Sequence, residues 1–297
     1  MPFRNHFKKD ALTVFVYHDI TNSPSEFSKM YGLNVPPEVF DYQINFINKY
    51  FNVISPDELL AGRIPLNAAL ITFDDGFKSY FSSAISILEK YNMPSIIFLN
   101  MEPIKGAIFW SGLITYLCNK KEDFINHLNA SLVESRDKRP LYLYCCRDLV
   151  DSYIKNTRIT YKEEVYKYVG EFANEKDLMG ACEHPLVFYG NHLFNHDVPL
   201  LMSDKEFLSS YFENHKALKK YPNYRSLFSF PFGQPDNCFA KRQIELVIKN
   251  GAKKVFSSYP VINYDISAPY LHRIPLNSFN NTKARVWFSI LRRSFKI

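Results

Sequence analysis

Short apolar runs alternate with helix-period segments along most of this chain, and polar residues stand where the runs end. An apolar run of about four to eight residues bounded by turn residues is typical of a buried strand. We therefore expect strands at 12–17, 70–73, 94–100, 185–192, 226–233, 253–258 and 270–276. Between them, apolar residues recur at helical spacing, most clearly at 36–51 and 77–88. This alternation indicates βα units around a parallel sheet or barrel.

Capping boxes mark where two of the predicted helices begin. Ser55 is followed by Pro56 and then by Glu58, and Ser203 is followed three residues later by Glu206. In this pattern the Ser and Glu side chains bond backbone N–H groups that the first helical turn leaves unpaired. We therefore expect helices to start directly after Ser55 and Ser203.

The regular alternation lapses between residues 104 and 183. This stretch is rich in polar residues, and it contains a further capping box at Thr160–Glu163. We expect a mostly helical insertion, 104–183, folded over one face of a single domain that spans 1–297. A chain of 297 residues that is 46% hydrophobic can bury the core of one large α/β domain.

Charge and cysteine content narrow the class of protein. A formal net charge of +6 without a block of Lys and Arg argues against nucleic acid as a partner. It is compatible with acidic glycans, phosphates or an anionic membrane surface. The five cysteines form no CxxC pair, which fits a reducing cytosol. The first apolar run stops at His18 and Asp19, so we expect neither a signal peptide nor a membrane anchor, and a cytoplasmic location.

Three polar clusters lie at predicted strand ends, where parallel α/β folds gather their catalytic groups. They are His18–Asp19, Asp74–Asp75 and His192–Asn195–His196. Two adjacent carboxylates repel each other unless a cation lies beside them. Because the alternation of side chains breaks at a strand end, both carboxylates can face one pocket. The aspartate pair therefore points to a bound cation.

The two later histidines are candidate ligands of that cation. His192 and His196 are four residues apart, so one helical turn would place both imidazoles on the same side. The metalloprotease pattern HExxH does not apply, because Leu193 follows the first histidine. Two histidines and one aspartate form a facial set of metal ligands, which leaves the other aspartate as a general base. Alone, each motif is more often a solvated turn or a surface pair; together, after apolar strands, they favour a metal site.

These residues resemble the motifs of the polysaccharide deacetylases, carbohydrate esterase family 4 with its NodB homology domain. "TFDDG" at 72–76 matches the first motif of that family, and "GNHLFNH" at 190–196 matches its His-x3-His motif. "FPFG" at 230–233 is similar to the Pro-Tyr-Gly strand end, with Phe232 for the tyrosine. The resemblance runs from about 12 to 276, outside the insertion. It implies a distorted (β/α)7-type barrel and a divalent metal ion, with Zn²⁺ as first choice.

The same resemblance implies a role for each motif residue. Asp74 would be the catalytic base, and the metal ligands would be Asp75, His192 and His196. Many family members carry an Arg two residues before the Pro of the third motif, where this chain has Ser229. We hypothesise that Arg273 supplies the positive charge instead.

The general acid is the second point of departure from the family pattern. The usual late histidine motif is not clear, although His272 is a candidate. The early "VYHDI" resembles the branch that contains the poly-N-acetylglucosamine deacetylases, in which an early strand-end histidine is the acid. We therefore expect His18 to protonate the leaving amine, with His272 as second choice.

The expected function is metal-dependent removal of an N-acetyl group from an amino sugar. In the cytoplasm, the substrate would be a surface-polysaccharide or lipopolysaccharide precursor, either a nucleotide sugar or a lipid-linked sugar, rather than a finished glycan. A deformylase or another amidohydrolase on the same fold would use the same residues. A catalytically inactive homologue would only bind the glycan.

The C-terminal segment suggests a membrane partner. Treated as a helix, 283–297 has a basic side and an apolar side, formed by Arg285, Arg292, Arg293 and Lys296 and by Val286, Trp287, Ile290 and Leu291. A basic amphipathic helix can lie on an anionic membrane, here at its inner face. A terminal helix packed on the barrel fits the same pattern equally well.

Overall fold

The strands follow the apolar runs of the sequence. The computed structural model describes residues 11–131, 145, 147–157 and 162–292. Its strands are β1 (Leu12–Tyr17), β2 (Asp19–Ile20), β3 (Asn34–Val35), β4 (Asn52–Val53), β5 (Ala68–Phe73), β6 (Ser95–Leu99), β7 (Val187–Asn191), β8 (Tyr224–Ser229), β9 (Lys254–Phe256), β10 (Tyr270–Leu271) and β11 (Ile274–Pro275).

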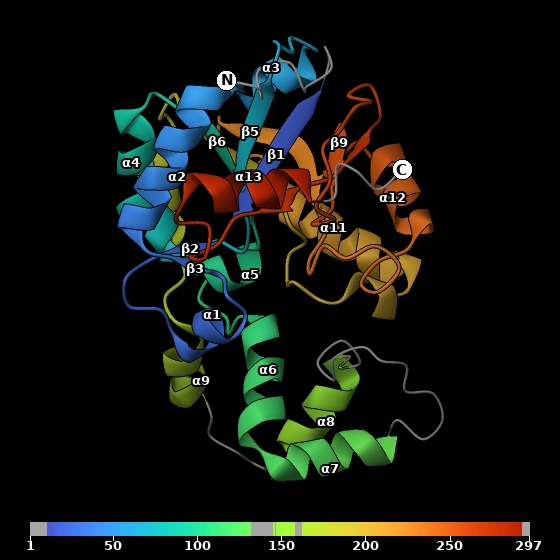
Figure 1. The fold of residues 1–297 in the computed structure, drawn as a ribbon. Coiled ribbons are helices and arrows are strands. Elements are labelled where there is room, and N and C mark those ends of the chain that lie inside the picture. The colour runs from blue at the N-terminus through green and yellow to red at the C-terminus, as the bar shows by residue number, and fades with distance from the viewer. Residues whose placement is uncertain (1–10, 132–144, 146, 158–161, 293–297) are drawn as a thin grey trace.

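Helices connect these strands, and several of them cover the outside of the sheet (Figure 1). They are α1 (Glu26–Met30), α2 (Pro37–Tyr50), α3 (Pro56–Leu60), α4 (Ile85–Lys90), α5 (Met101–Ile104), α6 (Trp110–Lys120), α7 (Glu122–Ser131), α8 (Arg147–Thr157), α9 (Lys162–Val169), α10 (Glu175–Ala181), α11 (Asp204–Leu218), α12 (Lys241–Lys249) and α13 (Lys283–Leu291). The capping boxes that start α3 and α11 are present as predicted at Ser55 and Ser203. Thr160, of the third predicted box, lies outside the described residues.

The main sheet is parallel throughout and curls into a distorted barrel. Its strand order is β10-β9-β8-β7-β6-β5-β1-β11, with β4 paired to β5. The two ends of this order meet in one stretch of chain, because β10 pairs with β9 and β11, three residues further on, pairs with β1. If residues 270–275 are counted as one barrel strand, the described residues form a barrel of seven strands. The other six are β1, β5, β6, β7, β8 and β9. The predicted α/β class and distorted (β/α)7-type barrel are confirmed.

Alternation along the strands decides which side chains enter the barrel. One core cluster contains every second strand residue, including Leu12, Val14, Ala68, Leu70, Ile96 and Phe98. The residues between them, such as Ile71, pack in another cluster with helix residues such as Phe40. The first series therefore points into the barrel and the second points toward the helices. A residue that continues the first series past a strand's carboxyl end lies at the barrel mouth.

The helices between β6 and β7 form a group of their own. Figure 1 shows α6, α7, α8 and α9 together below α5, apart from the sheet. They share a separate apolar core that includes Leu117, Phe124, Val150, Tyr153 and Val165. Because α5 directly follows the carboxyl end of β6, this group lies on the side of the barrel mouth. We call residues 110–169, which contain α6 to α9, the helical segment.

The expected helix at 77–88 contains an irregular turn. Residues Tyr80–Ala84 are π-helical, and the regular helix α4 follows them. Tyr80 and Ala84 are both fully buried, and the Tyr80 hydroxyl lies 2.9 Å from Ser95 Oγ on β6. The wider turn therefore coincides with a buried polar contact to the sheet.

The apolar side of the C-terminal helix packs on the barrel. Val286, Trp287 and Ile290 of α13 are buried in the main core, where the Trp287 ring lies 5.3 Å from that of Phe46. These residues are therefore not a membrane-facing surface, and of the two arrangements expected for this helix, the one packed on the barrel is confirmed. Arg293 and Lys296 of the predicted basic side lie outside the described residues. Among the described residues, no helix has both the length and the apolar character needed to cross a membrane.

Candidate metal and catalytic site

Asp74 and Asp75 follow β5 at the mouth of the barrel. Asp74 continues the inward series Ala68, Leu70, Thr72, so its carboxylate points into the mouth. Asp75 should point outward by the same alternation, but its backbone is left-handed, with φ of 72°. The turn continues through Gly76, whose N–H donates to the Asp74 carbonyl at 2.9 Å. This tight turn brings both carboxylates to the same pocket, as predicted.

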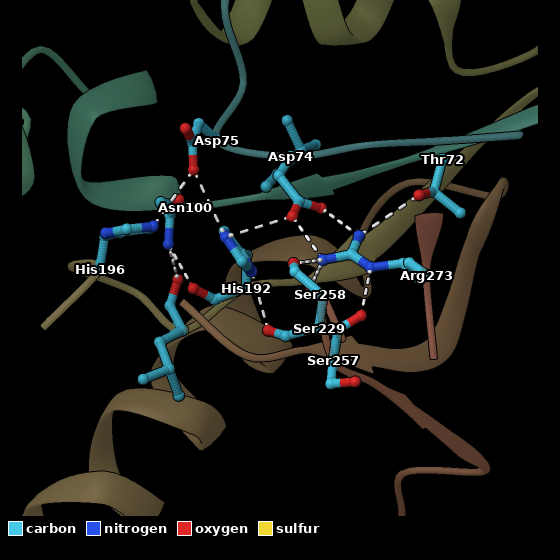
Figure 2. Close-up of polar contacts among 12 residues, drawn as sticks. Thr72, Asp74, Asp75, Asn100, His192, His196, Ser229, Ser257, Ser258 and Arg273 are labelled. Atoms are coloured by element: carbon cyan, nitrogen blue, oxygen red, sulfur yellow. Dashed lines mark hydrogen bonds and ion pairs between the residues drawn. The ribbon is translucent and has the colours of Figure 1, made fainter. Parts of the chain in front are cut away.

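Arg273 is fully buried and pairs with Asp74 through two parallel hydrogen bonds (Figure 2). Its Nη1 donates to Oδ1 at 2.7 Å, and its Nη2 donates to Oδ2 at 2.6 Å. The other guanidinium N–H groups reach the Ser257 carbonyl and the hydroxyls of Thr72, Ser229 and Ser258. The structure thus brings Arg273 to the place for which sequence analysis proposed it. Ser229, which stands where an Arg was expected, accepts a hydrogen bond from that guanidinium.

The guanidinium sets the ionisation of the catalytic-base candidate. Burial alone would raise the pKa of the Asp74 carboxyl, because it disfavours the charged form. The charge and hydrogen bonds of Arg273, together with His192 and His18, outweigh this effect and hold the pKa below its ordinary value. Asp74 is therefore a carboxylate at neutral pH, as a general base must be. Its Oδ2 lies 4.0 Å from Nε2 of His192, so one carboxylate oxygen faces the histidines.

Asp75, His192 and His196 form a compact set of metal-ligand atoms. The Oδ1 atom of Asp75 lies 3.4 Å from Nε2 of His192 and 3.2 Å from Nε2 of His196. All three residues are buried, and their ligand atoms lie within 4.8 Å of one another. Ligand atoms about 2.0–2.2 Å from one tetrahedral ion lie about 3.3 Å apart. The observed spacing therefore fits a single divalent cation.

The second nitrogen of each imidazole has its own partner. Nδ1 of His192 lies 2.8 Å from the Ser229 carbonyl oxygen, and Nδ1 of His196 lies 2.8 Å from Ser111 Oγ. At His192 the carbonyl can only accept, so Nδ1 carries the proton and Nε2 keeps a lone pair for a metal. Burial also lowers the pKa of His196, which favours the neutral form that binds metals. The chemistry of the donor set thus fits the metal implied by the sequence.

The two histidines lie on a loop, so the expectation that a helical turn would align them is wrong. Residues 192–197, which we call the metal-ligand loop, follow β7 without helical structure. Leu193 and His196 both have left-handed backbones, with φ of 62° and 55°. Such conformations cost about 1–3 kcal/mol each for residues other than Gly. Backbone reversal at these two positions brings the rings 5.0 Å apart.

Side chains of the barrel hold this loop in its strained form. Asn100, directly after β6, donates to the His192 and Leu193 carbonyls. The hydroxyl of Ser210 on α11 accepts from the Phe194 N–H at 3.0 Å and donates to Asn195 Oδ1 at 2.8 Å. Asn195 is thus part of the loop's support rather than a ligand. These bonds run between protein groups and hold the loop in this conformation.

The candidate ligands open into a cavity of about 310 Å³ at the barrel mouth. Its lining contains the aspartates, both loop histidines and His18, which continues the inward series of β1. The walls include the aromatic side chains of Phe27, Tyr31, Phe109 and Phe232. None of the described residues that line the cavity is Lys or Arg. The described lining therefore offers no Lys or Arg side chain to a phosphate group.

Two other predicted polar residues lie outside this cavity. His272 follows the inward-facing Leu271, so its side chain points out of the barrel. Its Nδ1 lies 2.8 Å from Ser257 Oγ. Its ring packs between Tyr259 and Tyr270. Asp19 accepts hydrogen bonds from Ser28 and Ser79, which joins the first loop to α1 and to the helix after β5. Asp19 therefore has a structural role, and His272 does not reach the pocket.

Sequence analysis missed the residues that support the ligands from the helical segment. Ser111 on α6 contacts His196, and Arg147 on α8 forms an ion pair with Asp197 in the metal-ligand loop. Neither residue stands in a motif. Ser111 carries no sequence signal beyond its place at the start of a helix. The contact of Arg147 depends on a tertiary arrangement that no local pattern encodes.

Comparison with solved structures identifies the fold of this chain. No protein-family model matches the sequence, and no curated protein matches it. The structure nevertheless has the polysaccharide deacetylase fold over nearly its full length, with a buried Asp-His-His set at the barrel mouth. The resemblance seen in the sequence motifs is confirmed at the level of the fold.

Three similar structures illustrate the match. IcaB from Ammonifex degensii aligns with a TM-score of 0.61 at 17% identity, covering 96% of this chain and 99% of that one. The Streptococcus pyogenes deacetylase PplD, in complex with acetate, gives 0.58 at 14% identity, covering 94% and 98%. A de-N-acetylase from Aggregatibacter actinomycetemcomitans gives 0.56 at 15% identity, covering 95% and 100%. This chain therefore spans nearly the whole length of each of these solved chains.

Proposed function

We propose that this protein is a metal-dependent hydrolase that removes an N-acetyl group from an amino sugar. The proposal rests on one observation: a candidate metal site and a candidate general base lie side by side at the barrel mouth. A three-residue ligand set lies beside a carboxylate that a buried arginine keeps ionised. The deacetylases among the similar structures support the same reaction class.

Asp75, His192 and His196 would hold the divalent metal ion, with Zn²⁺ as the first choice. When bound, such an ion polarises the amide carbonyl and makes water a better nucleophile at neutral pH. The ligand set leaves Asp74 outside it, with Oδ2 turned toward the ligands. Two adjacent carboxylates thus have separate tasks.

Asp74 acts as the general base. One of its oxygens accepts a proton from the water that attacks the amide carbonyl carbon. The two bonds from Arg273 fix the plane of the carboxylate and favour its ionised form before the reaction. Arg273 is therefore a positioning residue, because it acts on the substrate only through Asp74.

His18 acts as the general acid. It donates a proton to the amide nitrogen as the C–N bond breaks, so acetate and a free amino sugar are released. Its place in the cavity lining supports this role over His272, whose ring is turned away from the pocket. The sequence places both histidines next to a predicted strand, but of the two only His18 lines the cavity together with Asp74.

The cavity supports a single sugar unit as the reacting group. Its volume of about 310 Å³ is at the low end of ligand sites. Because the described lining has no Lys or Arg, a phosphate or pyrophosphate on the substrate would have to lie outside the cavity. We therefore propose a surface-polysaccharide or lipopolysaccharide precursor whose sugar enters the pocket. A lipid-linked sugar is preferred to a nucleotide sugar because Phe279 and Phe288 form an exposed aromatic surface beside α13.

We also propose a cytoplasmic location at the inner face of the membrane. The support is a surface beside α13 on which Phe279 and Phe288 are 74% and 65% exposed. Arg285 lies between them, since its guanidinium donates to the Phe279 carbonyl and it precedes Phe288 by one helical turn. Exposed aromatic and basic side chains together favour an anionic membrane surface. Co-sedimentation with anionic vesicles should fall when both phenylalanines become Ala.

Acetate release tests the proposed reaction directly. The Zn²⁺-loaded protein is incubated with N-acetylated nucleotide sugars, lipid-linked sugars and short oligosaccharides, and with N-formyl analogues in parallel. We expect acetate release, greatest from the lipid-linked sugars, and loss of at least a hundredfold in Asp74→Asn. Preferential formate release would favour a deformylase. Sugar binding without any release, unchanged in Asp74→Asn, would favour a glycan-binding protein.

A further inference from the structure

The metal-ligand loop has a second set of supports outside the barrel. Two side chains of the helical segment reach it, and they contact consecutive residues. Ser111 contacts His196, and Arg147 contacts Asp197. The family-like motifs lie on the barrel, so these contacts are a feature of the segment that packs over it.

Ser111 controls the orientation of the His196 ring. The hydroxyl lies 2.8 Å from Nδ1, and both side chains are buried, with 3% and 5% exposure. This contact leaves Nε2 directed at Asp75, 3.2 Å away. Phe109, one residue before α6, packs on the same ring at 5.0 Å between centroids. The start of α6 thus fixes the imidazole on two sides.

Arg147 ties three parts of the molecule together. Its Nε lies 3.1 Å from both carboxylate oxygens of Asp197, and its Nη2 donates to Glu102 on α5 at 2.9 Å. The guanidinium also lies over the Trp110 ring, 4.4 Å from its centroid. Asp197 in turn accepts from Asn195 at 2.6 Å, across the turn that contains His196. Arg147 therefore holds the end of the loop where the backbone is left-handed.

We propose that Ser111 and Arg147 are positioning residues for the metal site, so that the helical segment sets how tightly the metal binds. Ser111 acts through the imidazole of His196, and Arg147 acts through the backbone of the loop. The inference rests on the proposed metal site, but it assigns part of that site's affinity to residues that are not metal ligands. Outer partners of this kind change metal affinity by about 10–100-fold when they are removed.

Equilibrium binding of Zn²⁺, measured by competition with a chelator, tests this role. We expect Ser111→Ala and Arg147→Met each to weaken binding about tenfold or more, and Arg147→Lys to fall between wild type and Arg147→Met. Thermal unfolding of the metal-free proteins is measured in parallel. Ser111→Ala removes a single hydroxyl, so it keeps the test valid if Arg147→Met does not fold.

Tyr153→Phe is the matched control. Tyr153 is on α8 with Arg147, but its hydroxyl donates to Asp123 on α7 at 2.7 Å, within the helical segment. Its loss should lower the unfolding temperature and leave Zn²⁺ affinity unchanged. The inference is overturned if Ser111→Ala and Arg147→Met bind Zn²⁺ like wild type, or if Tyr153→Phe weakens binding equally. Absence of Zn²⁺ binding by the wild-type protein would overturn the proposed function as well.

Discussion

The two sides of the catalytic cavity are built in different ways. On the barrel side, Asp74 and Arg273 stand at strand ends, are buried, and have partners fixed by the register of neighbouring strands. On the other side, Ser111 comes from α6 and Phe109 from the residue before it, and the core of that helix is separate from that of the barrel. Residues that would handle protons thus belong to the more rigid framework. Residues that would shape the pocket and tune the metal belong to a part that packs onto it.

The difference has a physical basis in how each part is stabilised. Strand pairing fixes a residue at the barrel mouth through backbone bonds on both sides, so its position does not depend on one contact. The helical segment reaches the site through a few side-chain bonds, and Arg147 at its contact with Asp197 is 36% exposed. We therefore expect substitutions on the barrel side to remove function and those on the helical side to adjust it.

Removing a ligand on the barrel side should have the largest effect. His192→Ala leaves only Asp75 and His196 as ligands, one fewer than the three protein ligands of a catalytic zinc site. It also leaves space for water where the imidazole was. We expect no stoichiometric Zn²⁺ by metal analysis and acetate release at background. His272→Ala is the control, because that ring lies outside the cavity, and it should retain both. Full metal content in His192→Ala would contradict the assigned ligand set.

Breaking the buried ion pair should cost both stability and pH tolerance. Arg273→Met leaves the Asp74 carboxylate buried without its cation, which destabilises a protein by roughly 3–5 kcal/mol. Since Arg273 lowers the pKa of Asp74, its loss raises that pKa. The base then stays protonated to higher pH, and the acidic limb of the kcat/KM profile moves to higher pH.

Denaturant unfolding and the pH–rate profile check these two effects separately. Ser229→Ala removes one hydroxyl acceptor of the same guanidinium but leaves its charge beside Asp74. It should shift neither quantity by as much as Arg273→Met. An acidic limb that stays in place in Arg273→Met would show that Arg273 does not control the ionisation of the base.

The two candidate acids allow a smaller but sharper comparison. His18 directly follows β1, and His272 lies two residues before β11, the strand that pairs with β1. Only His18 lines the cavity, so His18→Ala should lower kcat by about a hundredfold, and His272→Ala should leave it within about twofold. Steady-state rates at matched metal content distinguish them. Equal losses in both variants would mean that neither donates the proton directly.

Much of the barrel side could be predicted because short stretches of sequence determine where its strands lie and which way their side chains point. Apolar runs located the strands, and the alternation of residues explains why Asp74 and Arg273 point into one mouth. The pairing of Arg273 with Asp74 could be proposed from the family resemblance, which implies an Arg at the position where this chain has Ser229. The loop around His196 could not be predicted in this way, because spacing of four residues suggests a helix. Its left-handed turns depend on bonds from Asn100 and Ser210.

The helical side was predictable only as a class of structure. Its spacing indicated helices, but the contact of Arg147 with Asp197 joins residues 50 positions apart and follows from packing. The same holds for the apolar side of α13, where periodicity marks a buried face without saying what covers it. Val286 and Trp287 face the barrel because aromatic residues of α2 provide a surface for them.

Packing within the helical segment offers the smallest and most local perturbation. A Cβ at Gly112 on α6 would lie 2.2 Å from Val169 Cγ2 on α9, so the two helices can approach this closely only with Gly. Gly112→Ala should therefore destabilise the protein by about 1–3 kcal/mol through overpacking. At Gly180 on α10 a Cβ would meet no atom within 4 Å, and Gly180→Ala should be neutral or stabilising by up to about 1 kcal/mol. Because Gly112 follows Ser111, Gly112→Ala should also weaken Zn²⁺ binding while leaving the pH–rate profile of the metal-loaded enzyme in place. A displaced acidic limb in Gly112→Ala would mean that the two sides of the cavity are not mechanically separate.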